Sequence, residues 1–199
     1  LPAARARGGG AMAGAAREAP TCLLLGAAGG GKSLLARRLR HIRRGPGRQG
    51  HRGGHGGDRG TRGETIVGTN LTDLQLPRRV TLRELGGCMG PIWPSYYGEC
   101  SALLFVVDAT NPTQVSSSCI LLLSVLSAET LAAVPVLVIF NKIDVPCYMS
   151  LVEVKSLFRM QDIISCATQS ITVLETSARD GTGLADVLQW LRATLGDAR

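Results

Sequence analysis

Residues 26–33 read GAAGGGKS, and this segment restricts the possible fold more than any other part of the chain. It matches the pattern G-x-x-x-x-G-K-[ST], follows the apolar residues 22–25 and precedes a helical pattern over residues 34–39. In a strand–loop–helix context such loops bind phosphate, because backbone N–H groups and the helix N-terminus face the anion. The sequence therefore predicts a phosphate-binding loop made of Gly26, Ala27, Ala28, Gly29, Gly30, Gly31, Lys32 and Ser33.

Two side chains of this loop have chemical roles in the prediction. Lys32 is expected to reach the β- and γ-phosphates, and Ser33 is expected to ligate Mg²⁺. The alternative is a flexible glycine turn that contains a lysine by chance. The chain has only three lysines, Lys32, Lys142 and Lys155. One of them lies in this loop and another in the motif at residues 141–144, so we favour the phosphate loop.

The second motif is Asn141-Lys142-Ile143-Asp144, which follows the apolar run VPVLVIF at residues 134–140. It therefore lies where a buried parallel strand is expected to end. The Asp144 carboxylate can accept hydrogen bonds from both N1–H and the exocyclic amine of guanine, whereas adenine has no such pair of donors. Discrimination is strong because the wrong base leaves a buried charge unpaired. Asn141 is expected to brace the loop, and the stem of Lys142 to cover the ring.

Strand-like and helix-like segments alternate along most of the chain. This alternation predicts an α/β fold, with a mostly parallel six-stranded sheet covered by helices on both faces. A hairpin turn is expected at residues 77–79, so the strands on either side of it should form an antiparallel pair at one edge. The expected strands are 21–25, 71–76, 80–85, 102–108, 134–141 and 171–176, and the expected helices are 32–42, 113–128, 150–158 and 183–195.

Composition indicates one domain with two segments that do not belong to its core. Residues 1–20 are rich in Ala, Gly and Arg and predict a disordered tail, and residues 45–63 are nearly half glycine and contain no apolar residue. The domain is thus expected over residues 21–199, interrupted by this Gly/Arg-rich segment.

The net charge of +7 comes from arginines that precede residue 64, and the rest of the chain is mildly acidic. The six cysteines form no C-x-x-C pair and no apolar run has the length of a membrane span, so we expect a reduced, cytoplasmic protein.

These motifs together resemble the ADP-ribosylation-factor-like branch of the small GTPases. Residues 83–88 and 104–109 are similar to that branch's W-D-V-G-G-Q and L-I-F-V-V-D patterns, and residues 141–146 are similar to its N-K-x-D-x-P. The resemblance implies the P-loop small-GTPase fold and a GTP/GDP switch with Mg²⁺ that recruits effector proteins. It also implies that Gly87 senses the γ-phosphate and that Ser177 and Ala178 belong to the base-binding loop, with the Ala178 N–H meeting guanine O6.

The chain departs from the family pattern at two positions near the expected phosphates. Cys88 replaces the glutamine that orients the attacking water, so no catalytic residue is assigned and intrinsic hydrolysis is expected to be slow or absent. Glu84 replaces the aspartate that supports Mg²⁺ from outside its coordination sphere. The extra methylene either changes that contact or is simply tolerated.

The first switch fits the family pattern less well. Alignment on Gly68 puts Ile66 where the Mg²⁺-binding threonine belongs, and Thr65 is one residue early. Either the loop shifts by one residue and Thr65 binds the metal, or this ligand is lost. The preceding Gly/Arg-rich segment is either a true insertion or an error of the gene model.

The expected partners are a guanine nucleotide, effector proteins at the switches, and exchange or activating proteins. We expect no specific nucleic-acid binding, because no aromatic residue lies among the arginines of residues 37–62, and no stable membrane anchor. Three functions remain open. They are a switch with weak hydrolysis, a competent GTPase that a partner protein assists, and another kind of P-loop nucleotide-binding protein such as a kinase or ATPase.

Overall fold

A computed structural model describes residues 19–42, 68–146 and 150–196. Most of the predicted tail, the Gly/Arg-rich segment 45–63, and both Thr65 and Ile66 lie outside these described residues. The predictions on those segments therefore stay predictions.

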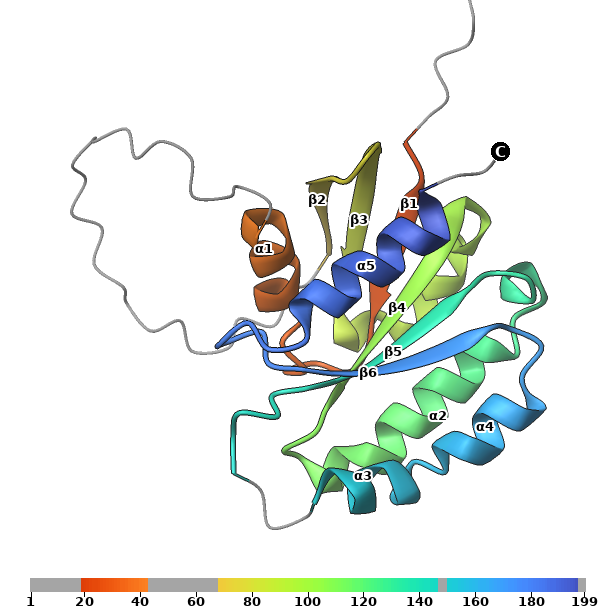
Figure 1. Cartoon of the computed structure of the whole chain (residues 1–199). Helices are drawn as coiled ribbons and strands as arrows, with labels where there is room; N and C mark the ends of the chain where they lie inside the picture. The colour runs from red at the N-terminus through yellow and green to blue at the C-terminus, as the bar shows by residue number, and fades with distance from the viewer. Residues whose placement is uncertain (1–18, 43–67, 147–149, 197–199) are drawn as a thin grey trace, which may run out of the picture.

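The described chain forms a six-stranded sheet with the strand order β2-β3-β1-β4-β5-β6 (Figure 1). Strands β2 and β3 pair antiparallel at one edge, and all other neighbouring strands pair parallel. This arrangement confirms the predicted mostly parallel sheet with an antiparallel edge hairpin. The strands are β1 (Thr21–Leu25), β2 (Thr69–Gln75), β3 (Arg79–Leu85), β4 (Cys100–Asp108), β5 (Val136–Asn141) and β6 (Ile171–Thr176).

Helices cover both faces of the sheet and enclose two apolar layers. The first layer packs α1 (Lys32–Ile42) and α5 (Leu184–Leu195) on one face. The second layer packs α2 (Val115–Leu126), α3 (Leu151–Leu157) and α4 (Met160–Cys166) on the other face, as Figure 1 shows. The predicted two-sided α/β architecture is therefore confirmed.

Strand β1 explains why the sheet needs both layers. Cys22 and Leu24 belong to the layer under α1 and α5, whereas Leu23 and Leu25 belong to the opposite layer. Successive side chains of a strand point to opposite faces, so a continuous apolar run stays buried only when both faces are covered. All four side chains are fully buried.

The structure differs from the sequence prediction mainly after strands β3 and β5. Residues 87–99 form the irregular 3-10 segment η1, which contains Pro91 and Pro94 and which no periodic pattern predicted. Helix α4 was also missed, because Arg159 (φ 52°) takes a left-handed conformation that separates it from α3.

The predicted helix 113–128 consists of the short turn η2 (Pro112–Gln114) followed by α2. The residue Arg79, predicted in the hairpin turn, is the first residue of β3.

The parallel strands place the expected functional loops side by side. Because β1, β4, β5 and β6 run in the same direction, their carboxyl ends meet at one edge of the sheet. Ligand sites of open α/β sheets lie at this edge. The strand ends here are Leu25, Asp108, Asn141 and Thr176.

Candidate functional site

The glycine-rich loop between β1 and α1 packs tightly on its neighbours at two positions. Gly26 has a φ of +136°, and a Cβ there would lie 2.2 Å from the carbonyl oxygen of Val106 in β4. Gly31 has a φ of +89°, and a Cβ there would lie 2.5 Å from Nδ2 of Asn141. Only glycine fits these backbone conformations and distances, so the motif glycines at the two ends of the loop are required by the fold.

Lys32 lies at the start of α1 with its side chain folded back along the loop. Its Nζ donates hydrogen bonds to the carbonyl oxygens of Gly26 and Ala27, both at 2.9 Å. Lys32 is 6% exposed, and this burial lowers the pKa of its ammonium group, while the nearby Glu84 carboxylate acts in the opposite direction. A buried positive charge is thus positioned directly beside the backbone of the loop.

Asn141, the last residue of β5, connects three segments that are distant in sequence. Its Nδ2 donates to the carbonyl oxygen of Gly30 at 2.9 Å. Its Oδ1 accepts hydrogen bonds from the Thr176 hydroxyl and from the Ala178 N–H, both at 3.0 Å. With 1% exposure, Asn141 is a buried junction between the phosphate-type loop and the loop after β6.

Asp144 and Ser177 face each other at the carboxyl ends of β5 and β6. The Ser177 hydroxyl donates to Oδ1 of Asp144 at 2.7 Å and accepts from the backbone N–H of Asp180 at 3.1 Å. The carboxylate is therefore held in place, and the bond from Ser177 leaves it further lone pairs that no donor among the described residues is shown to use. The N–H of Ala178 is already donated to Asn141, so a base oxygen would have to share it or replace that bond.

Lys142 has a strained backbone and a partner that the sequence analysis missed. Its φ is 71°, which is unusual for a residue other than glycine. Its ammonium group pairs with Oδ2 of Asp108 at 2.5 Å. Asp108 ends β4 directly opposite Asn141 in the sheet register, and this strand-end position was the signal that could have identified it.

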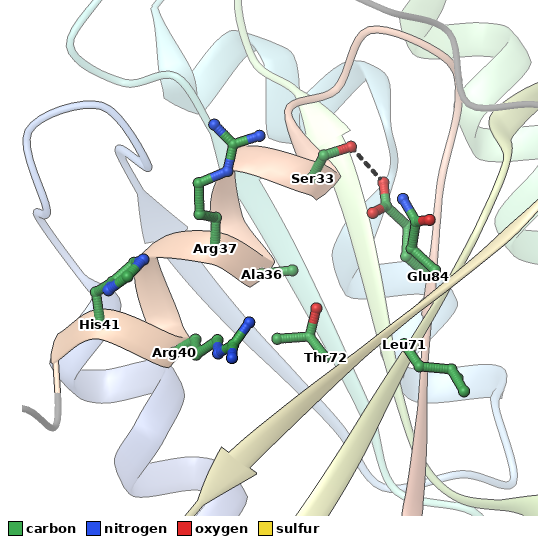
Figure 2. Close-up of a pocket in the computed structure, with 9 residues that line it drawn as sticks. Ser33, Ala36, Arg37, Arg40, His41, Leu71, Thr72 and Glu84 are labelled. Carbon is green, nitrogen blue, oxygen red and sulfur yellow. Dashed lines mark hydrogen bonds between the residues drawn. The ribbon is translucent and has the colours of Figure 1, made fainter. Parts of the chain in front are cut away.

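Ser33 and Glu84 bring together two side-chain oxygens that could bind a metal, between α1 and β3. The Ser33 hydroxyl donates to Oε1 of Glu84 at 2.7 Å, and Glu84 is 4% exposed. Both line a pocket of about 230 Å³ that Figure 2 shows between α1 and the β2–β3 hairpin. A hydroxyl and a carboxylate are oxygen ligands of the kind that Mg²⁺ prefers, so these residues fit that ion. The other lining residues are Ala36, Arg37, Arg40, His41, Asn70, Leu71 and Thr72.

The segment after β3 lies against the glycine-rich loop. A Cβ at Gly87 would lie 2.2 Å from the backbone nitrogen of Ala28, so Gly87 is in direct backbone contact with the loop. The indole N–H of Trp93 donates to the carbonyl oxygen of Gly86 at 3.1 Å and fixes the start of this segment. The adjacent Cys88 side chain is exposed.

The structure thus brings together all of the predicted site residues that it describes, whereas Thr65 lies outside the described residues. Within the part of the chain that the structure covers, no helix is long and apolar enough to cross a membrane.

Comparison with known proteins gives consistent results. Residues 64–195 match the model of the ADP-ribosylation factor family. Human ADP-ribosylation factor-like protein 16 is 59% identical over 175 residues, which cover 87% of this chain and 85% of the relative. Human ADP-ribosylation factor-related protein 1 is 31% identical over 136 residues, which cover 64% of each protein.

The fold also matches a solved structure. The Arl6 BBS3 small GTPase from Trypanosoma brucei, solved with the nucleotide analogue GppNp, has a TM-score of 0.71 to this chain at 18% identity. The match covers 90% of this chain and 98% of that protein. From its sequence, its relatives and its fold, the chain belongs to the ADP-ribosylation factor family of small GTPases.

Proposed function

We propose that this protein is a guanine-nucleotide switch that binds GTP and GDP with Mg²⁺ and acts through effector proteins. The observation that carries the proposal is the junction at Asn141, which bonds the loop of Gly30 and the loop of Ala178 at once. A ligand with a base at one end and phosphates at the other fits this connection, because the two loops are held at a fixed separation. A ligand without a base would make no contact with Asp144 and Ser177.

Each end of the site has a defined role in this proposal. Asp144, held by Ser177, accepts the two guanine donors, and Asn141 keeps this loop in register with the phosphate loop. The backbone N–H groups of residues 26–31 and the Lys32 ammonium bind the phosphates. The Mg²⁺ ion, held by the Ser33 hydroxyl with help from Glu84, supplies positive charge at the phosphate oxygens.

In this proposal, switching between the GDP-bound and GTP-bound states depends on Gly87. Gly87 lies on the backbone of Ala28, beside the buried Lys32. A γ-phosphate bound to Lys32 needs room at this position, so its arrival displaces the Gly87 segment and its loss allows the segment to return. Effectors that recognise the displaced segment then bind only the GTP form.

Hydrolysis is expected to be slow because the residue after Gly87 is Cys88. A thiol is a weak hydrogen-bond donor and acceptor, so it orients a water molecule poorly. The alternative is a competent GTPase in which an activating protein positions the water. A P-loop kinase or ATPase is disfavoured, because the Asp144–Ser177 pair is suited to guanine and not to adenine.

The proposal is tested by competition for a fluorescent GDP analogue in the presence of Mg²⁺. GTP and GDP should displace the analogue at similar concentrations, while ATP should not compete at a hundred-fold higher concentration, in line with roughly 10⁴-fold discrimination by hydrogen-bonding sites. Lys32→Ala and Ser33→Asn should lower affinity by well over ten-fold, since each removes a charged or metal contact. Lys155→Ala is the matched control, because Lys155 pairs with Glu175 and belongs to neither nucleotide motif. Equal competition by ATP and GTP would contradict the proposal.

A further inference from the structure

We infer that the protein has a second anion site, which binds a phosphate monoester in the pocket between α1 and β2. The site lies at the end of this pocket away from Ser33 and Glu84, and the residues that carry the inference are Arg37, Arg40 and Thr72. We call it the arginine end of the pocket. It shares no residue with the proposed nucleotide site, so the inference goes beyond the proposed function and does not depend on it.

The arginine end is well separated from the position proposed for Mg²⁺. Helix α1 rises about 1.5 Å per residue, so Arg40 lies roughly 10 Å farther along the helix than Ser33. On the other side of the pocket, Asn70 pairs with Glu84 in the register of β2 and β3, and Thr72 lies about 7 Å beyond it toward the hairpin tip. A ligand held between Arg40 and Thr72 therefore leaves the metal position free.

Three side chains of α1 bring hydrogen-bond donors to the arginine end. Arg37, Arg40 and His41 line the pocket at a spacing of three and four residues, which puts them on one side of the helix. Within the described parts of the chain, no carboxylate forms an ion pair with any of the three. Basic residues in a last turn also complement the helix dipole, but Arg37 lies more than a turn before the end of α1. The dipole therefore does not account for the whole cluster.

The acidic groups near the arginine end already have donors. Glu84 accepts the hydroxyl hydrogen of Ser33. Asp73 accepts from Arg79 at 2.6 Å, which lowers the pKa of Asp73 most, and the charge of Arg40 has a smaller effect in the same direction. An anion that binds Arg40 therefore does not have to break an existing ion pair of this arginine.

Strand β2 adds neutral donors across the pocket. Asn70 and Thr72 lie on the same face of the strand as Leu74, which belongs to the apolar layer under α1. Both side chains line the pocket, and Figure 2 shows the Arg40 guanidinium directed toward Thr72. The two elements thus present charged and neutral donors to one space.

This set of donors suits a phosphate group. A guanidinium offers parallel N–H donors that fit two phosphate oxygens at once, and the amide and the hydroxyl can donate to the remaining oxygens. The pocket volume of about 230 Å³ is below the roughly 300–1,000 Å³ of small-molecule sites, so it suits a single head group. A soluble phosphate ester and a phosphorylated lipid head group both carry this chemistry, and the experiment separates them.

The first test uses protein loaded with Mg²⁺·GDP, so that the proposed nucleotide site is occupied. Inorganic phosphate and inositol 4-phosphate are titrated, and the backbone amide signals are followed by ¹⁵N NMR. The largest shifts are expected at Arg40 and Thr72. No shift at these two residues would overturn the inference. Additional shifts at residues 26–33 would mean that the nucleotide loop is empty, which contradicts the proposed function and leaves the second site supported.

The second test removes the arginines with a charge-matched control. Arg37→Gln/Arg40→Gln should weaken phosphate binding roughly ten-fold or more, because charged hydrogen bonds are lost. Arg38→Gln/Arg192→Gln removes the same charge and should bind like the wild type. Arg38 donates to a backbone carbonyl oxygen outside the pocket, and Arg192 lies on α5. Equal losses in the two double variants would show that diffuse positive charge holds the phosphate, and would overturn the site.

Thr72→Val gives an independent result if the arginine variant does not fold. It removes one hydroxyl donor without any change in charge, so phosphate binding should weaken by roughly three-fold or more. Thr168→Val is its control, because that hydroxyl donates to the carbonyl oxygen of Ala132 at an exposed position outside the pocket. Wild-type affinity in Thr72→Val would overturn the inference.

Sedimentation with vesicles separates the two sources of the phosphate group. Phosphatidylcholine vesicles that contain phosphatidylinositol 4-phosphate present a phosphate monoester on a protruding head group, whereas phosphatidylserine vesicles of equal surface charge present none. Binding to the first vesicles alone, lost in Arg37→Gln/Arg40→Gln, identifies a lipid head group as the ligand. Binding of inositol 4-phosphate without vesicle binding identifies a soluble ester. Equal binding of the protein to both kinds of vesicle would contradict recognition of a phosphate monoester.

Discussion

The side-chain amide of Asn141 donates to the carbonyl oxygen of Gly30 over 2.9 Å and joins the end of β5 to the glycine-rich loop after β1. The same side chain accepts from Thr176 and Ala178, so three loops at one edge of the sheet share one buried residue. Movement of the phosphate loop relative to the base loop would break these bonds. The two halves of the proposed nucleotide site are therefore linked through one buried side chain.

Asn141→Ala should both destabilise the protein and weaken nucleotide binding. The change leaves a buried carbonyl, a hydroxyl and an N–H without partners, which should lower the free energy of unfolding by about 2–4 kcal/mol. Guanidinium chloride unfolding measures the stability, and fluorescent GDP titration measures the affinity. Asn111→Ala is the control, because the Asn111 side chain accepts a hydrogen bond from the Thr113 hydroxyl at an exposed site. If the two variants had equal effects, Asn141 would not be a junction.

The loop glycines should differ sharply in their tolerance of alanine. Gly26→Ala places a methyl group 2.2 Å from the Val106 carbonyl oxygen, so the strand or the loop must move and the loss should be on the order of 4 kcal/mol or more. At Gly29 a Cβ meets nothing within 4 Å, and only the φ of +80° is unfavourable. Gly29→Ala should therefore lose about 1–2 kcal/mol. Thermal and denaturant unfolding of the two variants checks the order, and the reverse order would contradict the loop structure.

The sequence predicted the sheet because the apolar runs of β1, β4 and β5 are long enough to be buried on both faces. It also predicted the residues at the strand ends, since Asn141 and Asp144 directly follow an apolar run. It failed where structure depends on contacts between distant segments. The segment η1 has no periodicity, and its start is held by the Trp93–Gly86 hydrogen bond, while the pairing of Lys142 with Asp108 depends on the β4–β5 register.

Cys88→Gln should raise the rate of GTP hydrolysis. The amide supplies both a donor and an acceptor for water, which the thiol does weakly. The rate is measured in a single turnover, with phosphate release as the signal, and Cys166→Gln is the control at an exposed cysteine outside the site. A wild-type rate as fast as that of glutamine-containing relatives would refute slow hydrolysis. No gain on restoring the amide would instead indicate that the first switch, with Thr65 and Ile66, limits the reaction.

The described cysteines should divide into two classes of reactivity. Cys88 and Cys166 are exposed, whereas burial raises the pKa of Cys22 far above its usual range and raises that of Cys100 to about 11. Because the thiolate is the reactive form and a raised pKa lowers its amount at pH 8, iodoacetamide should label Cys88 and Cys166 first. Peptide mass spectrometry over time, in native and denaturing buffer, gives the rate at each site.

Of the two exposed cysteines among the described residues, a bound nucleotide should change the labelling rate of only one. A non-hydrolysable GTP analogue with Mg²⁺ should alter the labelling rate of Cys88, which follows the loop contact of Gly87, and leave that of Cys166 unchanged. A Cys88 rate that is the same with and without the analogue would mean that this segment does not respond to the γ-phosphate.

The measurement that tests the central claim most directly is the base preference of Asp144→Asn. In the wild type, the carboxylate held by Ser177 accepts two donors from guanine, so GTP should bind tightly and xanthosine triphosphate weakly. The side-chain amide that this substitution introduces donates to the 2-oxo group of xanthine, so affinity for GTP should fall by roughly a hundred-fold or more while that for xanthosine triphosphate rises. Asp186→Asn, an exposed position on α5, should keep the wild-type preference. A variant that still prefers GTP as strongly as the wild type would contradict guanine recognition by Asp144.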